Sequence, residues 1–411
     1  MRFCIITLTT TILVLTKTTT TTTTIEECEK SEVVRGSWKQ KQNDLSTPIV
    51  FEDAFETFEK MKMWRDDDTY IFEKMPRIVT NVYVSNDTSA FYYGGSEQND
   101  LLKSTFESRL RNVGPPYVYY SGALSRTFLS LYFHLLFFYS SRCKFYIALC
   151  TTDWPNLESD LPFELFREFC VRLNDCVPPQ IWISEEGVET RAHYDAAHNY
   201  FTQIRGRKRF DLWPPSAHAS LHLHSSLSSF ARQPRDDIDL PLPHISVTLN
   251  PGDTLSLPAY WFHRVTALSP ITVSISIWTE STHELDTKES IDKTPLPFET
   301  SWSDETKWCA SLRFANQVLS FFEFPVVLRL LESRYENEVC PSEVSQLCLE
   351  FSNDTFDNFE SRAKTIVEKF QTISSIHIRE MYLWNWLESL AYFGTASNIH
   401  HVPNFLCALL A

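Results

Sequence analysis

His193 and Asp195 are separated by one residue in the segment RAHYDAAHNYF. In an extended strand, residues two apart project from the same face, so this imidazole and this carboxylate would point at one centre. An imidazole nitrogen and a carboxylate oxygen are both ligands of divalent transition metals. The spacing by itself also occurs in ordinary strands, so the prediction of a metal site needs a further ligand.

His263 supplies that ligand from a second strand-like segment, LSLPAYWFHRV. Two histidines and one carboxylate form a facial triad, which leaves coordination positions open on Fe(II). An oxygenase needs open positions, because molecular oxygen and a bidentate cosubstrate must both reach the metal. The sequence therefore predicts iron at His193, Asp195 and His263, with these residues as the catalytic centre of an oxygenase.

Lys208 predicts an anion beside this metal. If Arg205-Gly206 forms a two-residue hairpin turn, Gln203 pairs with Lys208, and the lysine then lies on the face of the metal ligands. A lysine that points into a protein interior is costly unless an anion compensates its charge. A bound dicarboxylate would supply the anion, and the Thr190 hydroxyl, three residues before His193, can contact the same carboxylate.

The sequence pattern of residues 180–280 predicts a region made mainly of β-strands. Turn residues such as Asn250-Pro251-Gly252-Asp253 separate the strand-like runs. In Ile271–Trp278, hydroxyl side chains alternate with β-branched apolar ones, as in a barrel wall that lines a polar cavity. Beyond about Pro295 the apolar residues recur at helical spacing. Among the tryptophans, Trp261 and Trp278 fit the core better than a substrate surface.

The order of HxD, NxF, a lysine fifteen residues after the first histidine, PGD and YWxH resembles the JmjC/cupin-type 2-oxoglutarate oxygenases. Within them it is most similar to the factor-inhibiting-HIF asparaginyl hydroxylase branch. The resemblance covers residues 180–280 strongly and residues 35–180 weakly. It implies a double-stranded β-helix (jelly-roll, cupin/JmjC) with flanking helices and a helical C-terminal extension. It also implies Fe(II), 2-oxoglutarate as cosubstrate and molecular oxygen.

The resemblance assigns iron binding to His193, Asp195 and His263. It assigns 2-oxoglutarate binding to Thr190, Asn199 and Lys208. The family also uses a tyrosine from an earlier strand, for which Tyr117, Tyr119 and Tyr120 are candidates and Tyr119 is our choice. Ser276 stands where the asparaginyl hydroxylase has an asparagine near the iron. This difference affects the expected substrate and leaves the expected iron chemistry unchanged.

The implied activity is a dioxygenase that decarboxylates 2-oxoglutarate and hydroxylates a protein side chain. A demethylase, an RNA-modifying oxygenase and a non-catalytic cupin-fold interaction protein are the alternatives. A complete triad argues against the interaction protein, and Lys208 argues against a zinc or manganese isomerase of the same fold. The chain has 37 Lys plus Arg against 52 Asp plus Glu, a net charge of −15, so we expect a protein substrate and no nucleic acid.

The amino terminus resembles a secretory signal. Arg2 precedes an apolar run, Phe3–Leu15, and a threonine run follows, so residues 1–24 form a signal-like segment. An uncleaved anchor or a mispredicted start are the alternatives. The signal predicts the endoplasmic reticulum lumen or secretory pathway. Without it we expect a cytoplasmic or nuclear protein, with no membrane contact beyond this segment.

Residues 25–295 are predicted to form the JmjC/cupin-like domain, and residues 296–411 a helical region that can pair two copies in a homodimer. A hydrophobic stretch near 124–150 interrupts the domain. It reads as a buried helix or strand pair, as an insertion such as translated intron, or as a transmembrane segment, for which it is short. In an oxidising compartment Cys170–Cys176 and Cys340–Cys348 are candidate disulfides, with buried free thiols as the alternative.

Several other histidines lie near the triad without its spacing: His198, His218, His222, His224 and His244. The pair His222 and His224 fits a loop better than a second metal site. The C-terminal aromatic stripe of Tyr382, Trp384 and Trp386 fits a packed helical core.

Overall fold

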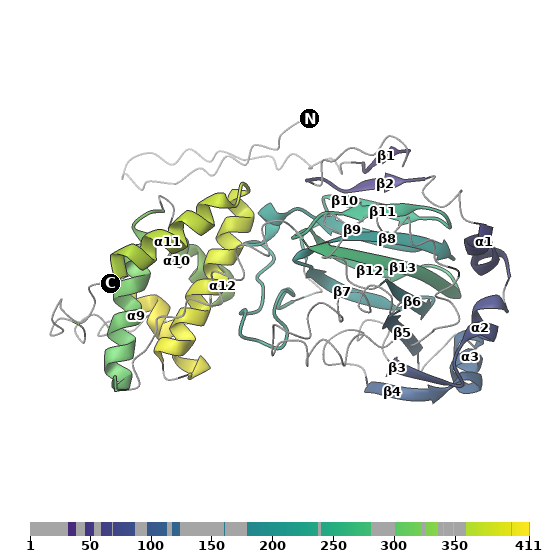
Figure 1. The fold of residues 1–411 in the computed structure, drawn as a ribbon, viewed down its shortest axis with the longest axis horizontal. Coiled ribbons are helices and arrows are strands. Elements are labelled where there is room, and N and C mark those ends of the chain that lie inside the picture. The colour runs from purple at the N-terminus through teal and green to yellow at the C-terminus, as the bar shows by residue number, and fades with distance from the viewer. Residues whose placement is uncertain are drawn as a thin grey trace, which may run out of the picture.

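The computed structural model describes most of the β-rich region and most of the C-terminal helices (Figure 1). The described residues are 32–37, 46–52, 59–67, 69–86, 97–112, 117–123, 160, 179–236, 240–280, 301–322, 325–335, 340, 348, 359–395 and 397–410. The signal-like segment 1–24, the stretch 124–150, the predicted boundary at 295/296 and the pair Cys170 and Cys176 lie outside them. No helix in the described part of the chain is both long and apolar enough to cross a membrane.

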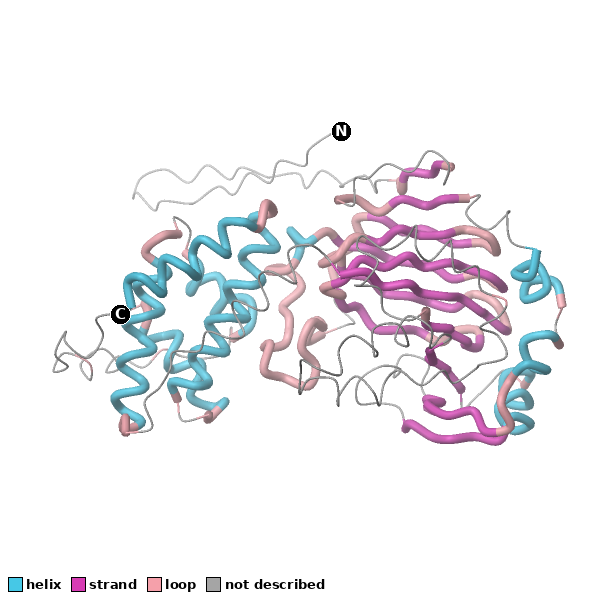
Figure 2. Tube along the Cα trace, in the orientation of Figure 1, coloured by secondary structure: helices cyan, strands magenta, loops and turns pink. Residues whose placement is uncertain are grey.

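Two sheets contain the strands of the protein that the structure describes, and these strands stack in the right half of Figure 2. The larger sheet has nine strands in the order β1 (Val34–Gly36), β2 (Ile49–Phe51), β11 (Thr254–Leu257), β8 (Ala197–Arg205), β13 (Ile271–Glu280), β6 (Gln180–Glu185), β5 (Tyr117–Ala123), β3 (Ile78–Ser85) and β4 (Glu97–Leu102). The smaller has four, in the order β10 (Ile245–Leu249), β9 (Lys208–Trp213), β12 (Phe262–Ala267) and β7 (Glu189–Tyr194).

The sheets face one another across an apolar interior. The pairings are antiparallel apart from β1 with β2. Phe201 of the larger sheet and Phe210 of the smaller meet edge to face, with ring centroids 4.8 Å apart. Around them a single cluster joins residues of both sheets, including Trp182, Leu212 and Leu255. This arrangement confirms the predicted double-stranded β-helix.

The predicted hairpin at Arg205-Gly206 is wrong. Strand β8 pairs with β11 and β13, whereas β9 pairs with β10 and β12, so Gln203 has no register with Lys208. The chain instead crosses from one sheet to the other at this point. Gly206 has φ +65°, and a Cβ there would lie 2.5 Å from the carbonyl oxygen of Ile271, so the crossing needs a glycine.

Helices lie at both ends of the sheets (Figure 1). At one end are α1 (Glu59–Asp66), α2 (Tyr70–Lys74) and α3 (Lys103–Arg111). At the other are α9 (Asp304–Leu319), α10 (Val326–Arg334), α11 (Phe359–Thr372), α12 (Ile376–Gly394) and α13 (Val402–Ala408). Trp384 and Trp386 are buried in the core of this second group, as predicted, which confirms the helical C-terminal extension.

The C-terminal helices pack on the sheets through the loop between β9 and β10. This loop includes η2 (Pro215–Ala217) and lies between the two groups of elements in Figure 2. The buried ion pair of Arg334 on α10 with Glu388 on α12 extends to it, because the Glu388 carboxylate accepts a hydrogen bond from the Ser226 backbone. Tyr382 of α12 is half-buried and packs against the core of the helical region. Its hydroxyl forms a hydrogen bond with the hydroxyl of Tyr260, which lies between β11 and β12.

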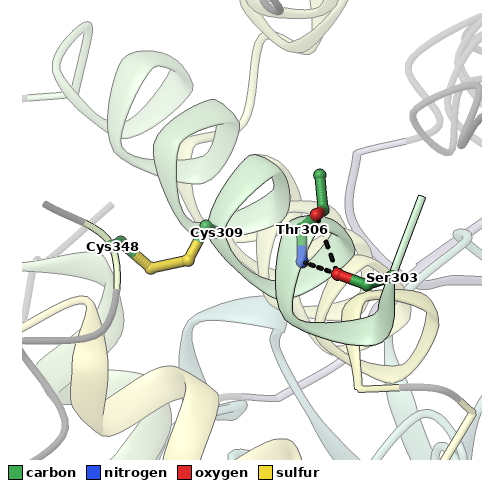
Figure 3. The surroundings of a disulfide bond; sticks show 4 residues. All are labelled: Ser303, Thr306, Cys309 and Cys348. Carbon is green, nitrogen blue, oxygen red and sulfur yellow. Dashed lines mark hydrogen bonds between the residues drawn. A yellow bond between two sulfur atoms is a disulfide. The ribbon is translucent and has the colours of Figure 1, made fainter. Parts of the chain in front are cut away.

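Among the described residues, two disulfides connect segments of the helical region. Cys309 on α9 bonds Cys348, beside the turn in which Ser303 caps the same helix through the Thr306 backbone N–H (Figure 3). Cys340 bonds Cys407 on α13, 67 positions further along the chain. The predicted pair Cys340–Cys348 is therefore wrong, because proximity in sequence does not decide which cysteines the folded helices bring together.

We expect the double variant Cys340→Ser/Cys407→Ser to lose about 2–4 kcal/mol of stability, since a disulfide that closes a long loop restricts the unfolded chain. Thermal unfolding followed by tryptophan fluorescence measures the loss. Peptide mapping without reductant checks the pairing independently, and a peptide containing Cys340 linked to Cys348 would contradict it.

Candidate metal centre and cosubstrate pocket

The pairing of β7 with β12 brings the two predicted histidine ligands together. His193 is directly opposite His263 in the antiparallel register, and their ring centroids are 4.2 Å apart. Asp195 follows β7 by one residue, and its Oδ2 lies 3.8 Å from Nε2 of His263. Ligand atoms of the three side chains all lie within 4.8 Å of one another. The structure therefore places the predicted triad around one point.

Both histidines present the same nitrogen to this point. Nδ1 of His193 lies 2.8 Å from the Arg191 carbonyl oxygen, and Nδ1 of His263 lies 3.1 Å from that of Trp261. In the neutral ring Nδ1–H donates to the carbonyl, which leaves the Nε2 lone pair for a metal. Burial, aided by the nearby His193, lowers the pKa of His263 to about 4, so this ring is in its ligand form at neutral pH.

Asp195 is held by two contacts outside the triad. The indole N–H of Trp278 donates to Oδ2 over 3.3 Å, and the backbone N–H of Tyr260 donates to the Asp195 carbonyl over 2.8 Å. Tyr260 has φ +68°, a left-handed conformation that a bulky residue rarely adopts. Its hydroxyl bonds the Tyr382 hydroxyl of α12, so the C-terminal helices are linked to the backbone of Asp195.

An irregularity in β7 brings Thr190 to the same side as His193. Val265 pairs with Thr190 and His263 with His193, so β7 has one more residue than β12 between these positions. Such a bulge reverses the alternation of side chains over one step. Thr190 and His193 are an odd number of residues apart, yet both line the cavity that the metal ligands face.

This cavity has a volume of about 60 Å³ and is lined by strands of both sheets. Every site residue predicted from the sequence lines it: Tyr119, Thr190, His193, Asp195, Asn199, Lys208, His263 and Ser276. Residues that sequence reasoning did not assign to the site complete the wall: Trp182, Phe201, Phe210, Val265 and Trp278.

Lys208 is the first residue of β9 and is only 3% exposed. Its Nζ lies 5.3 Å from the centre of the Phe201 ring. Among the residues that the structure describes, no carboxylate is within ion-pair distance of this ammonium, and burial lowers its pKa to about 7. A buried lysine without a protein anion is the expected partner of an anionic ligand.

The remaining cavity residues offer further polar groups. Oδ1 of Asn199 is buried and has no hydrogen-bond partner among the described residues. The Tyr119 ring stacks on Trp182, with centroids 5.7 Å apart, and the Trp182 N–H donates to Oγ of Ser276. Of the three candidate tyrosines, Tyr119 lines the cavity, while the side chains of the other two lie outside the described part of the chain.

Trp278 packs against the core of the two sheets, as predicted, and it also belongs to the cavity wall. It is half-buried, lines the cavity and contacts Asp195 through its indole N–H. Residues two apart on a strand share a face, so its spacing from Ser276 was the signal that could have placed it here. Trp261, in contrast, is buried as predicted and donates to the Ser46 carbonyl.

A sequence profile of the Cupin-like domain matches residues 38–284, more than half of the 411 residues. The chain belongs to the cupin-like domain family. All the residues that line the cavity lie within the matched range. The profile and the predicted JmjC-type resemblance agree on the class of protein, and the finer likeness to the asparaginyl hydroxylase branch stays a prediction.

Curated relatives of this cupin-like protein have several functions in their names. They include lysine-specific demethylase JMJ31 of Arabidopsis thaliana, 32% identical over 124 residues, and an HSPB1-associated protein 1 homolog of Danio rerio, 31% identical over 147. Mouse tRNA wybutosine-synthesizing protein 5 is 30% identical over 148 residues. These matches cover 27%, 33% and 32% of this chain and 22%, 32% and 46% of the relatives.

We expect Trp278→Phe to weaken divalent metal binding about tenfold, because the carboxylate loses the donor that orients it. Titration with Co²⁺, followed by visible absorption, measures the affinity. Trp182→Phe is the matched control, since this indole lines the same cavity and donates to Ser276 instead of a ligand. Equal losses in the two variants would contradict the role of Trp278.

Proposed function

We propose that this protein is an Fe(II)- and 2-oxoglutarate-dependent dioxygenase that hydroxylates a protein side chain. One observation carries the proposal: a complete set of His193, Asp195 and His263 shares a small cavity with the buried ammonium of Lys208, which has no carboxylate partner among the described residues. The triad can bind Fe(II), and Lys208 can bind a carboxylate of 2-oxoglutarate. The cavity therefore offers a site for the metal and a site for the cosubstrate.

The donor set fits iron. Two imidazole nitrogens and one carboxylate oxygen bind one face of Fe(II) and leave the opposite positions open. Backbone carbonyls hold Nδ1 of both rings, and Trp278 holds the carboxylate, so the ligands need little rearrangement to bind. Open positions on a preorganised centre are what a chelating cosubstrate and oxygen require.

The other polar residues of the cavity fit a dicarboxylate. Lys208 supplies the charge for the far carboxylate, and the Thr190 hydroxyl faces the same cavity. Asn199, with its unsatisfied Oδ1, and Tyr119 add polar groups nearby. With Fe(II) and 2-oxoglutarate bound, the site supplies oxidative decarboxylation to succinate and carbon dioxide, coupled to hydroxylation of a C–H bond.

The other residues exclude water and orient the bound groups. Phe201 and Phe210 pack edge to face beneath the lysine, and Val265 adds an apolar side chain beside Thr190. Apolar surroundings lower the local dielectric constant, which strengthens the attraction between the Lys208 ammonium and an anion. The chain thus binds and positions the cosubstrate with its own side chains.

The site defines the type of reaction more narrowly than it defines the substrate that is hydroxylated. Relatives named as a lysine-specific demethylase and as tRNA wybutosine-synthesizing proteins favour two further substrates, a methylated lysine and a tRNA. The net charge of −15 counts against RNA, because phosphate contacts need a basic surface. A protein substrate is the proposal that fits this charge.

We expect purified protein to release succinate when it is given Fe(II), ascorbate and 2-oxoglutarate, with an increase when a peptide library contains a substrate. Asp195→Ala should lower this turnover by about 100-fold or more, because loss of a ligand costs more than loss of an outer partner. Asp304→Ala, an exposed carboxylate on α9, is the control that should retain full turnover.

Peptide and tRNA arms of the same assay separate the candidate substrates. Stimulation by tRNA alone would replace the protein substrate by an RNA one. No turnover, together with no binding of iron or 2-oxoglutarate, would contradict the oxygenase and favour a non-catalytic interaction protein.

The KM for 2-oxoglutarate should rise with pH above about 7. The pKa of Lys208 in the unliganded protein is lowered to about 7, and the charged ammonium is the form that pairs with a carboxylate. Above this pKa the charged fraction falls by up to about tenfold per pH unit, and the affinity falls with it. Steady-state kinetics between mildly acidic and mildly alkaline pH measure the slope.

Lys208→Arg is the matched variant, because a guanidinium stays protonated over this range. Its KM is expected to be higher than that of the native protein and nearly independent of pH. The same slope in both proteins would contradict the role of Lys208 as the anion-binding group.

A further inference from the structure

A second cluster of ligand-type side chains lies where the sheets meet the C-terminal helices. His218 directly follows η2 in the loop after β9, whereas His377 and Glu380 belong to α12. Residues three apart on a helix share a face, so the histidine and the glutamate of α12 project together toward the loop. Ligand atoms of all three lie within 4.8 Å of one another.

The cluster is strongly buried. The His218 side chain is fully buried, the Glu380 side chain is 3% exposed, and His377 is half-buried. The rings of His218 and Trp384 are 4.8 Å apart, so one wall of the cluster is apolar. Polar side chains buried to this degree are normally satisfied by a partner, and those of this cluster point at one another.

The orientation of His218 leaves one nitrogen available. Its Nδ1 lies 2.9 Å from the Pro215 carbonyl oxygen, so in the neutral ring Nδ1–H donates and Nε2 keeps its lone pair. Nε2 lies 3.1 Å from Oε2 of Glu380, yet among the described residues it has no partner with hydrogen-bond geometry. A buried, unsatisfied ring nitrogen thus faces a carboxylate and a second imidazole.

We propose that His218, His377 and Glu380 bind a divalent transition metal ion, with Zn²⁺ as the ion that this donor set suits. Zinc accepts imidazole nitrogen and carboxylate oxygen, and three protein ligands leave a fourth position for water. Paired histidine and glutamate ligands three apart on a helix are a known way to present donors to a metal. The site is separate from the triad of the cavity and needs none of its residues.

An ion pair within the protein is the competing explanation of the same cluster. Nε of Arg329 on α10 lies 3.0 Å from Oε1 of Glu380, and this guanidinium alone can compensate the buried carboxylate. Oε2, however, is the oxygen that faces His218.

A metal here would join two parts of the chain. One ligand comes from the loop after β9 and two come from α12, so an ion bound only by the folded protein stabilises the packing of the helices on the sheets. Zinc in large excess over its dissociation constant should raise the Tm by about 5 °C. The competing ion pair predicts no response to zinc.

The test uses the full chain after treatment with a chelator. His193→Ala/His263→Ala first removes the triad, and this variant is titrated with Zn²⁺ by calorimetry. One equivalent of zinc and a raised Tm are expected. Adding His377→Ala should remove both, because this half-buried ligand can be lost with little damage to the core.

The control adds His400→Ala/His401→Ala, which changes two exposed histidines near the C-terminus, and should keep the equivalent of zinc. Zinc binding that survives His377→Ala, or that is lost with His400 and His401 instead, would overturn the site. So would the absence of binding to a triad variant whose circular dichroism is native. The oxygenase assay does not enter this test, so failure of either proposal leaves the other in place.

Discussion

The antiparallel pairing of β7 with β12 is the constraint on which the candidate active site depends. It sets His193 directly against His263, and the end of β7 then brings Asp195 to the same point. Backbone carbonyls hold Nδ1 of both histidines, so the strands that position the rings also determine which nitrogen faces the centre. A shift of one residue in this register would turn one histidine away from the other.

The larger sheet contributes the side of the cavity that faces the metal ligands. Trp278 and Asn199 come from β13 and β8, and they face the triad and Lys208 across the interior. The cavity therefore exists only because two sheets pack face to face. Its charge is unusual: a buried ammonium lies among aromatic rings with no carboxylate among the described residues to pair with it. An anionic ligand resolves this cost, which links the fold to the proposed cosubstrate.

The C-terminal helices are part of the same structure. Tyr382 of α12 bonds Tyr260, whose backbone N–H holds Asp195, and Glu388 bonds the loop after β9. A change in helix packing can therefore reach the backbone of Asp195 through the hydrogen bonds of Tyr260. The cluster of His218, His377 and Glu380 lies on this junction, so a metal there would act on the same contact.

Residue types and short spacings in the sequence alone determined much of this protein. The spacing of His193 and Asp195 and the helical periodicity near the C-terminus are local patterns, and local patterns report faces of strands and helices. They led to the β-rich fold with its helical extension and to the triad of metal ligands. The family resemblance supplied Asn199, Tyr119 and Ser276. The local patterns also placed Lys208 correctly for a wrong reason, since the supposed hairpin is a crossing between sheets.

Only the tertiary structure decided which distant segments meet. The bulge that turns Thr190 toward the cavity, the contact of Trp278 with Asp195 and the partners of Cys340 and His218 all join residues far apart in the chain. Such contacts depend on sheet order and helix packing, which no short spacing encodes. The sequence determined the chemistry that each segment can offer, and the packing of two sheets and a helical region decided which of these groups share a site.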